Sequence, residues 1–233
     1  MSTMEIPAST PTSTSSVERH YHAKCFSSSS NLSDVKIQFG GKRIEAHKII
    51  LARGSRYFDR LFAGDGIVQH GRTIRLENID TEAAKGMLAW IYDTEYQRND
   101  RYIDKAGLTY PTNTPSEAYL YAVYLVNLYR AARKFEVPKL AAAIELRLDH
   151  VFMVVIFARH YELAGMRATE VARKLYAEHG AAKETFHHLR RIFVGRFATE
   201  YRTARDTKVL EEVMLDCPGL AVDVLRRLTK EEK

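Results

Sequence analysis

Cysteine is scarce in this sequence, and long apolar runs are missing. Cys25 and Cys217 are the two cysteines among 233 residues, too few for a disulfide framework and typical of a reducing compartment. The longest apolar run covers residues 151–158, far short of the roughly 20 residues that cross a bilayer. Residues 1–16 lack the basic start and apolar centre of a signal peptide. We therefore expect a protein of the cytoplasm or the nucleus, without a membrane partner.

Recognisable catalytic and metal-binding patterns are also missing. Asp34, His47 and Ser55 suggest a Ser-His-Asp arrangement by order alone. A triad is defined by geometry, however, and Ser55 is already explained as a helix cap. His187 and His188 are adjacent, so on a helix their side chains point about 100° apart and do not share a metal. We predict a protein that is not an enzyme and has no cofactor or metal site.

The composition that is present is that of a folded protein with a basic excess. A hydrophobic share of 45% and a charged share of 27% are ordinary for a globular domain. The net charge of +6 permits an acidic protein or a nucleic acid as partner. We interpret the cations after residue 180 as a solvated helix face, since no stacking or groove-reading motif accompanies them. These cations are Lys183, Arg190, Arg191, Arg196, Arg202, Arg205 and Lys208.

The N-terminal part of the chain reads as a polar arm followed by a hairpin. Residues 1–30 are rich in Ser and Thr, so we predict a disordered arm. Apolar residues alternate with polar ones over 35–39, the period of a half-buried strand. Gly40 and Gly41 then predict a tight turn into a second strand around residues 44–46. Ser55 is placed to cap a short helix that carries several aromatic residues.

The rest of the chain reads as one further strand and then helices. The third strand is predicted at residues 73–76, and Asp80 can cap the helix that follows. The polar segment 97–114 is predicted to be a mobile loop, which ends in a capping box at 114–117. A long apolar helix begins there. After Pro138 we predict only helices, with breaks near Gly165, Gly180, Gly195 and Pro218.

In this order, the residues resemble a BTB/POZ domain. The resemblance implies an α+β fold over residues 31–148, with a small three-stranded sheet flanked by a cluster of helices. An all-helical extension is then expected at 149–233. The short form is similar to the short BTB proteins common in fungi. The matching positions are Asp34-Val35, Ala46-His47-Lys48, Leu51-Ala52, Ser55-Arg56-Tyr57-Phe58, Leu61-Phe62, Ala89-Trp90-Ile91-Tyr92, Tyr129, Ala132, Lys134-Phe135, Pro138 and Leu140.

The family resemblance implies a non-enzymatic protein–protein interaction module that forms homodimers or acts as a scaffold. Dimerisation would run through the first helices. Several apolar residues there are candidates for the interface, although some of them are expected in the core instead. The candidates are Ile49, Ile50, Tyr57, Phe58 and Leu61.

Four polar residues of the same segment also match the family. Asp34 and Lys48 match positions that form a charged pocket in transcription-factor members, and a surface ion pair or two solvated charges is the alternative. His47 and Ser55 match as structural residues. We keep both interpretations of the Asp34–Lys48 pair.

Two other functions stay open on the same fold. The first is a substrate adaptor of a cullin-type ubiquitin ligase. Such adaptors tend to carry a hydrophobic residue and then, two positions later, Glu. Here Gln69 lies two positions after Ile67, and His70 lies two positions after Val68. The missing Glu therefore disfavours a cullin as partner. The second is a nucleic-acid-associated transcription regulator that uses the basic tail, which the absence of a readout motif disfavours.

Overall fold

The fold is known from a computed structural model, which describes residues 33–64, 73–92, 115–157, 163–176, 186–204 and 207–230. The arm predicted at 1–30 and the loop predicted at 97–114 lie outside these residues. The segment with Ile67 and Val68 also lies outside them. Within the described ranges, no helix has the length and apolar character that crossing a membrane requires.

A three-stranded sheet forms one end of the molecule, in the order β2-β1-β3. β1 (Val35–Phe39) pairs antiparallel with β2 (Lys42–Ala46) and parallel with β3 (Thr73–Arg75). Gly40 and Gly41 have φ angles of +49° and +74°, which suit a tight hairpin turn. The alternating apolar side chains of β1 are all buried. The predicted hairpin and third strand are therefore confirmed.

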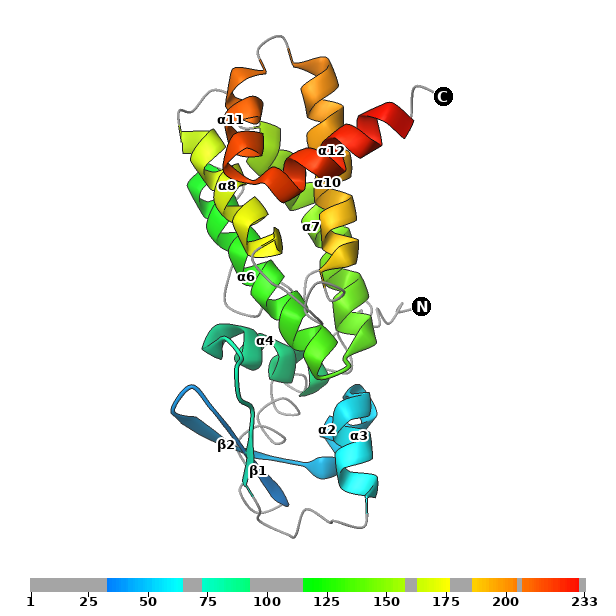
Figure 1. The fold of residues 1–233 in the computed structure, drawn as a ribbon. Coiled ribbons are helices and arrows are strands. Elements are labelled where there is room, and N and C mark those ends of the chain that lie inside the picture. Colours follow the sequence, from blue (N-terminus) through cyan, green and yellow to red (C-terminus); the bar gives the residue numbers. More distant parts are fainter. Residues whose placement is uncertain are drawn as a thin grey trace, which may run out of the picture.

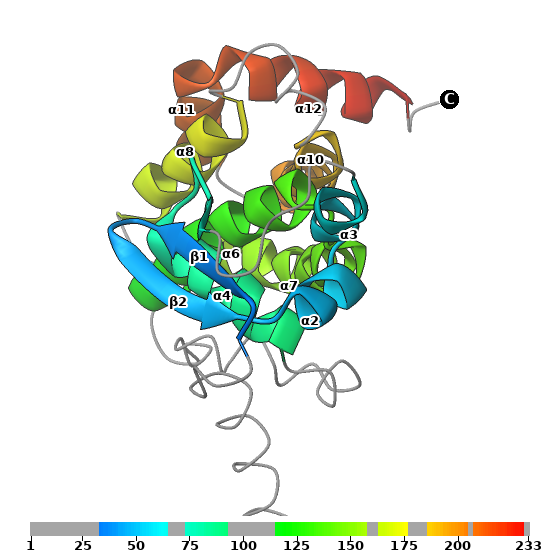
Figure 2. The same cartoon turned by 90° about the horizontal axis from the view of Figure 1, so that it is seen from below.

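Among the described residues, three helices lie in the part of the fold nearest the sheet. α2 (Lys48–Gly54) and α3 (Arg56–Ala63) pack against each other. α4 (Thr81–Tyr92) contacts both α2 and α6. Seen from below in Figure 2, β1 and β2 lie in front of α4, and α2 and α3 lie to the right of the strands. Asp80 caps α4 as predicted, because its Oδ1 accepts from the Ala83 N–H at 2.9 Å.

Long helices connect this end to the helical extension (Figure 1). α6 (Pro115–Lys134) packs against α7 (Pro138–Phe157), and both contact α8 (Leu163–Tyr176). α10 (His187–Thr203) lies against α7 and α12 (Pro218–Lys230), while α11 (Lys208–Asp216) contacts α8 and α12. The boundary predicted between residues 148 and 149 falls inside α7, so one helix belongs to both parts.

The break predicted near Gly165 agrees with the start of α8 two residues earlier, at Leu163. The break predicted near Gly195 is wrong, because this residue lies inside α10. One helical glycine costs only about 1 kcal/mol relative to Ala, which the packing of a buried helix face can offset. Gly180 lies outside the described residues, and α12 begins at Pro218 as predicted.

One hydrophobic core runs from the sheet into the extension. Where α7 meets α10, the Phe152 and Phe193 rings form an edge-to-face pair with centroids 5.0 Å apart. Arg196 of α10 forms an ion pair with Asp149 of α7, in which Nε donates to Oδ1 at 2.7 Å and Nη2 donates to Oδ2. The architecture is the expected α+β fold with a small sheet and an all-helical extension.

Candidate functional site

The start of α2 is fixed by a contact to the end of α4. His47 is 7% exposed, and its backbone N–H donates to the Tyr92 hydroxyl oxygen at 2.7 Å. His47 Nδ1 lies 3.2 Å from the same oxygen, so the hydroxyl can accept from the backbone and donate its own proton to the ring. Burial raises the pKa of Tyr92 to about 12, which keeps the hydroxyl protonated at neutral pH. These contacts fit the structural role predicted for His47, which stays a prediction.

The structure brings Asp34 and Lys48 together through the backbone. The Lys48 N–H donates to Asp34 Oδ1 at 2.8 Å. A carboxylate at the first turn of a helix accepts from an N–H that has no intrahelical partner. It is also attracted to the positive end of the helix dipole. Both residues are half-buried. Asp34 thus caps α2, and a charged pocket formed with the Lys48 side chain stays a prediction.

Ser55 joins α3 to the turn between α6 and α7. Its Oγ accepts from the Phe58 N–H at 3.2 Å and donates to the Phe135 carbonyl oxygen at 2.5 Å. Next to this contact, Arg60 Nη1 donates to Glu136 Oε2 at 2.6 Å, and Nη2 donates to Oε1. This hydrogen-bonded pair holds the pKa of Glu136 below its usual range. Hydrogen bonds to distant parts of the chain therefore hold both the start of α2 and the first turns of α3.

The hydrogen bonds of a catalytic triad do not occur at these residues. The Ser55 hydroxyl bonds the backbone of Phe58 and Phe135, while His47 Nδ1 meets Tyr92. No group of three His, Cys, Asp or Glu side chains suited to a metal occurs in the ranges that the structure describes. At Ser55 and His47 the observed hydrogen bonds therefore serve to hold α2 and α3 in place.

The apolar interface candidates differ in exposure. Ile49 is 79% exposed, whereas Ile50, Tyr57 and Leu61 are half-buried. Phe58 is fully buried and stacks on Phe135 at a centroid distance of 6.2 Å. Phe58 is therefore a core residue, and its prediction as an interface candidate is wrong. We call the other four residues the α2–α3 surface.

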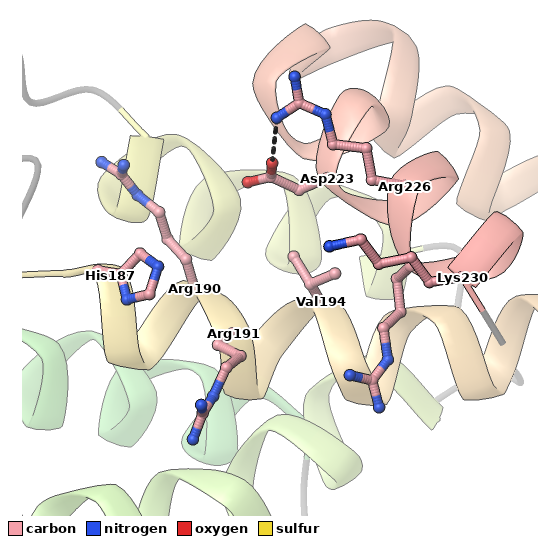
Figure 3. Close-up of a pocket in the computed structure, with 8 residues that line it drawn as sticks. His187, Arg190, Arg191, Val194, Asp223, Arg226 and Lys230 are labelled. Atoms are coloured by element: carbon pink, nitrogen blue, oxygen red, sulfur yellow. Dashed lines mark ion pairs between the residues drawn. The ribbon is translucent and has the colours of Figure 1, made fainter.

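The basic tail does not form one solvated face. Arg196 is bound to Asp149, and Arg190 is buried at 8% exposure. Arg190 and Arg191 of α10 instead line a groove with cations of α12, namely Arg226, Arg227 and Lys230 (Figure 3). The sequence reasoning missed these α12 residues. Their only signal is the spacing of four between Arg226 and Lys230, which places both on one helix face. Lys183 and Arg205 lie outside the described residues.

A known protein family matches the part of the chain that holds the α2–α3 surface. Residues 24–151 match the BTB/POZ domain family. The chain is 31% identical over 67 residues to Kelch repeat and BTB domain-containing protein 1 of Ectromelia virus (strain Moscow). The protein of the same name in Cowpox virus (strain Brighton Red) is 30% identical over 67 residues. Each match covers 29% of this chain and only 12% of the relative. The α10–α12 groove lies beyond the family match.

Proposed function

Because the chain belongs to the BTB/POZ domain family, we propose that it is a non-enzymatic interaction module that forms a homodimer through the α2–α3 surface. A BTB/POZ domain is a protein-interaction module, and the dimer is the specific form that we propose for it here. The exposure of Ile49 carries the proposal. The side chain of a large aliphatic residue is 79% exposed on a helix whose position is otherwise fixed by buried contacts.

The energetics of the α2–α3 surface favour association. Burying an exposed Ile side chain contributes about 1.5–3 kcal/mol. Ile50, Tyr57 and Leu61 retain exposed apolar area on the two helices. A stable interface buries about 800 Å² on each partner, so these residues form the apolar centre of a larger contact. The fixed helix positions mean that little ordering entropy is lost when the surfaces meet.

Analytical ultracentrifugation of Ile49→Asp and Leu146→Asp variants tests the proposal. Leu146 is 76% exposed on α7, so the control introduces the same charge at a matched exposure. We expect Ile49→Asp to dissociate to monomers at micromolar concentration, since a carboxylate in an apolar contact is strongly disfavoured. Leu146→Asp is expected to remain dimeric. An Ile49→Asp protein that stays as dimeric as the control contradicts the α2–α3 surface as the interface.

The Asp34–Lys48 pocket and the cullin adaptor are finer proposals on the same domain. A charged pocket formed by Asp34 and Lys48 would bind a partner protein without being needed for the folding of the domain. Lys48→Gln keeps the backbone N–H that donates a hydrogen bond to Asp34. The variant is therefore expected to fold and to lose only the protein that binds the pocket. Cullin recruitment would appear as co-elution with a purified cullin N-terminal region, and Gln69 and His70 argue against it. The likeness to short fungal BTB proteins stays a prediction.

A further inference from the structure

A strongly basic groove lies between α10 and α12, outside the residues that match the family. Its volume is about 770 Å³, within the range of about 300–1,000 Å³ that is usual for ligand sites. Of the eight described residues that line it, five are Arg or Lys and one is Asp223. With His187 neutral, the lining carries a formal charge of +4. Figure 3 shows the side chains coming from both helices, with Val194 between them.

Arg190 is a nearly buried cation in this groove. Its Nε donates to the Leu175 carbonyl oxygen at 2.6 Å, and its guanidinium carbon lies 4.9 Å from the centroid of the Tyr176 ring. None of the ion pairs between described residues involves Arg190. A desolvated charge without a counter-ion is unfavourable. An anion that enters the groove would therefore meet a cation whose desolvation has already occurred.

The one carboxylate of the groove is already engaged. Asp223 Oδ2 accepts from the Tyr176 hydroxyl at 2.8 Å, and Oδ1 lies 3.8 Å from Arg226 Nη1. Among the described residues, neither Arg191 nor Lys230 has a carboxylate partner. The Lys230 side chain extends toward Val194 in Figure 3. The groove therefore keeps an excess of positive charge that its own residues do not neutralise.

We propose that the α10–α12 groove binds an acidic segment of a partner protein, with clustered Asp and Glu side chains. The guanidinium forks of Arg190, Arg191 and Arg226 suit carboxylates, which they can bind through two parallel hydrogen bonds. A nucleic acid fits less well. Among the described residues, no Phe, Tyr or Trp lines the groove for base stacking. The cations also line one cavity, whereas a duplex presents its phosphates along an extended line.

Fluorescence anisotropy of the full chain with a short labelled peptide of Glu and Asp tests this site. A peptide of Gln and Asn with the same length is the neutral control. The test variant is Arg191→Gln/Lys230→Gln, and the charge-matched control is Arg43→Gln/Arg75→Gln, two exposed positions on the sheet. We expect the test variant to weaken binding about tenfold at about 0.15 M salt, because each exposed charged contact is worth a few-fold in affinity. The control variant is expected to change affinity less than about twofold.

Three results would overturn the acidic-peptide site. The first is no binding of the acidic peptide, or equal binding of the neutral one. The second is an equal loss of affinity in both double variants, which would reduce the effect to overall charge. The third is tighter binding of a single-stranded or duplex oligonucleotide of the same charge, which would assign the groove to nucleic acid. None of these results bears on dimerisation through α2 and α3.

Discussion

Gly86 lies at a close contact between α4 and α6, and replacing it with Ala gives a sharp test of this packing. A Cβ atom at Gly86 would lie 2.2 Å from the Tyr124 hydroxyl oxygen and 3.4 Å from Tyr124 Cζ. The hydroxyl is buried and has no hydrogen-bond partner in the described part of the chain. Burial also raises the pKa of Tyr124. The added Cβ would therefore clash with an oxygen atom whose removal breaks no hydrogen bond within the described residues.

The opposing contributions at Gly86 have known sizes. Ala is favoured over Gly in a helix by about 1 kcal/mol, whereas overpacking a tight contact costs about 1–3 kcal/mol. We expect Gly86→Ala to lower the free energy of unfolding by about 1 kcal/mol as the net of these two effects. Tyr124→Phe removes the clashing oxygen and is expected to be near neutral on its own. The double variant should recover at least wild-type stability, with a coupling energy of about 1–3 kcal/mol.

Urea unfolding of the two single variants and the double variant measures this coupling. Gly195→Ala is the matched control, because a Cβ at that helical position meets nothing within 4 Å. The control is expected to gain up to about 1 kcal/mol. Single effects that add to within about 0.5 kcal/mol would refute the proposed clash. A Gly86→Ala variant as stabilised as Gly195→Ala would refute it too.

Two further predictions concern single hydrogen-bonded side chains. Ser55→Ala removes a helix cap and the donor to Phe135, so we expect a loss of about 2 kcal/mol in urea unfolding; a loss below about 0.5 kcal/mol would contradict the bridging role. Arg196 holds the pKa of Asp149 below its usual range. A lowered folded pKa stabilises the fold above the unfolded pKa, and that contribution is lost as the pH falls below about 4. Both side chains are about two-fifths exposed, so Asp149→Asn should cost at most about 1 kcal/mol at pH 7 and less at low pH; a deficit independent of pH would contradict this.

Local features of the fold could be predicted from the sequence. The alternation over residues 35–39 and the two glycines after it determine a hairpin, because side-chain period and backbone φ act within a few residues. The helix caps at Ser55 and Asp80 are local in the same sense. Gly195 shows the limit of this reasoning, since packing of α10 against α7 keeps a helix through a residue that disfavours one.

Contacts between distant residues could not be predicted in this way. His47 meets Tyr92 across 45 positions, and Arg60 meets Glu136 across 76. Neither pair shares a periodic pattern that would identify it. The basic groove likewise depends on how α12 packs against α10, which brings Arg226 and Lys230 into one groove with Arg191. Residue types along one helix do not determine which second helix completes such a site.

Self-association of the chain through the α2–α3 surface can be tested by light scattering of the full chain over a micromolar concentration series. We expect a mass of twice the 26.7 kDa of one chain. We also expect Ile49→Asp to return the mass to that of one chain. A mass of 26.7 kDa for the unaltered protein across the whole series would contradict the claim.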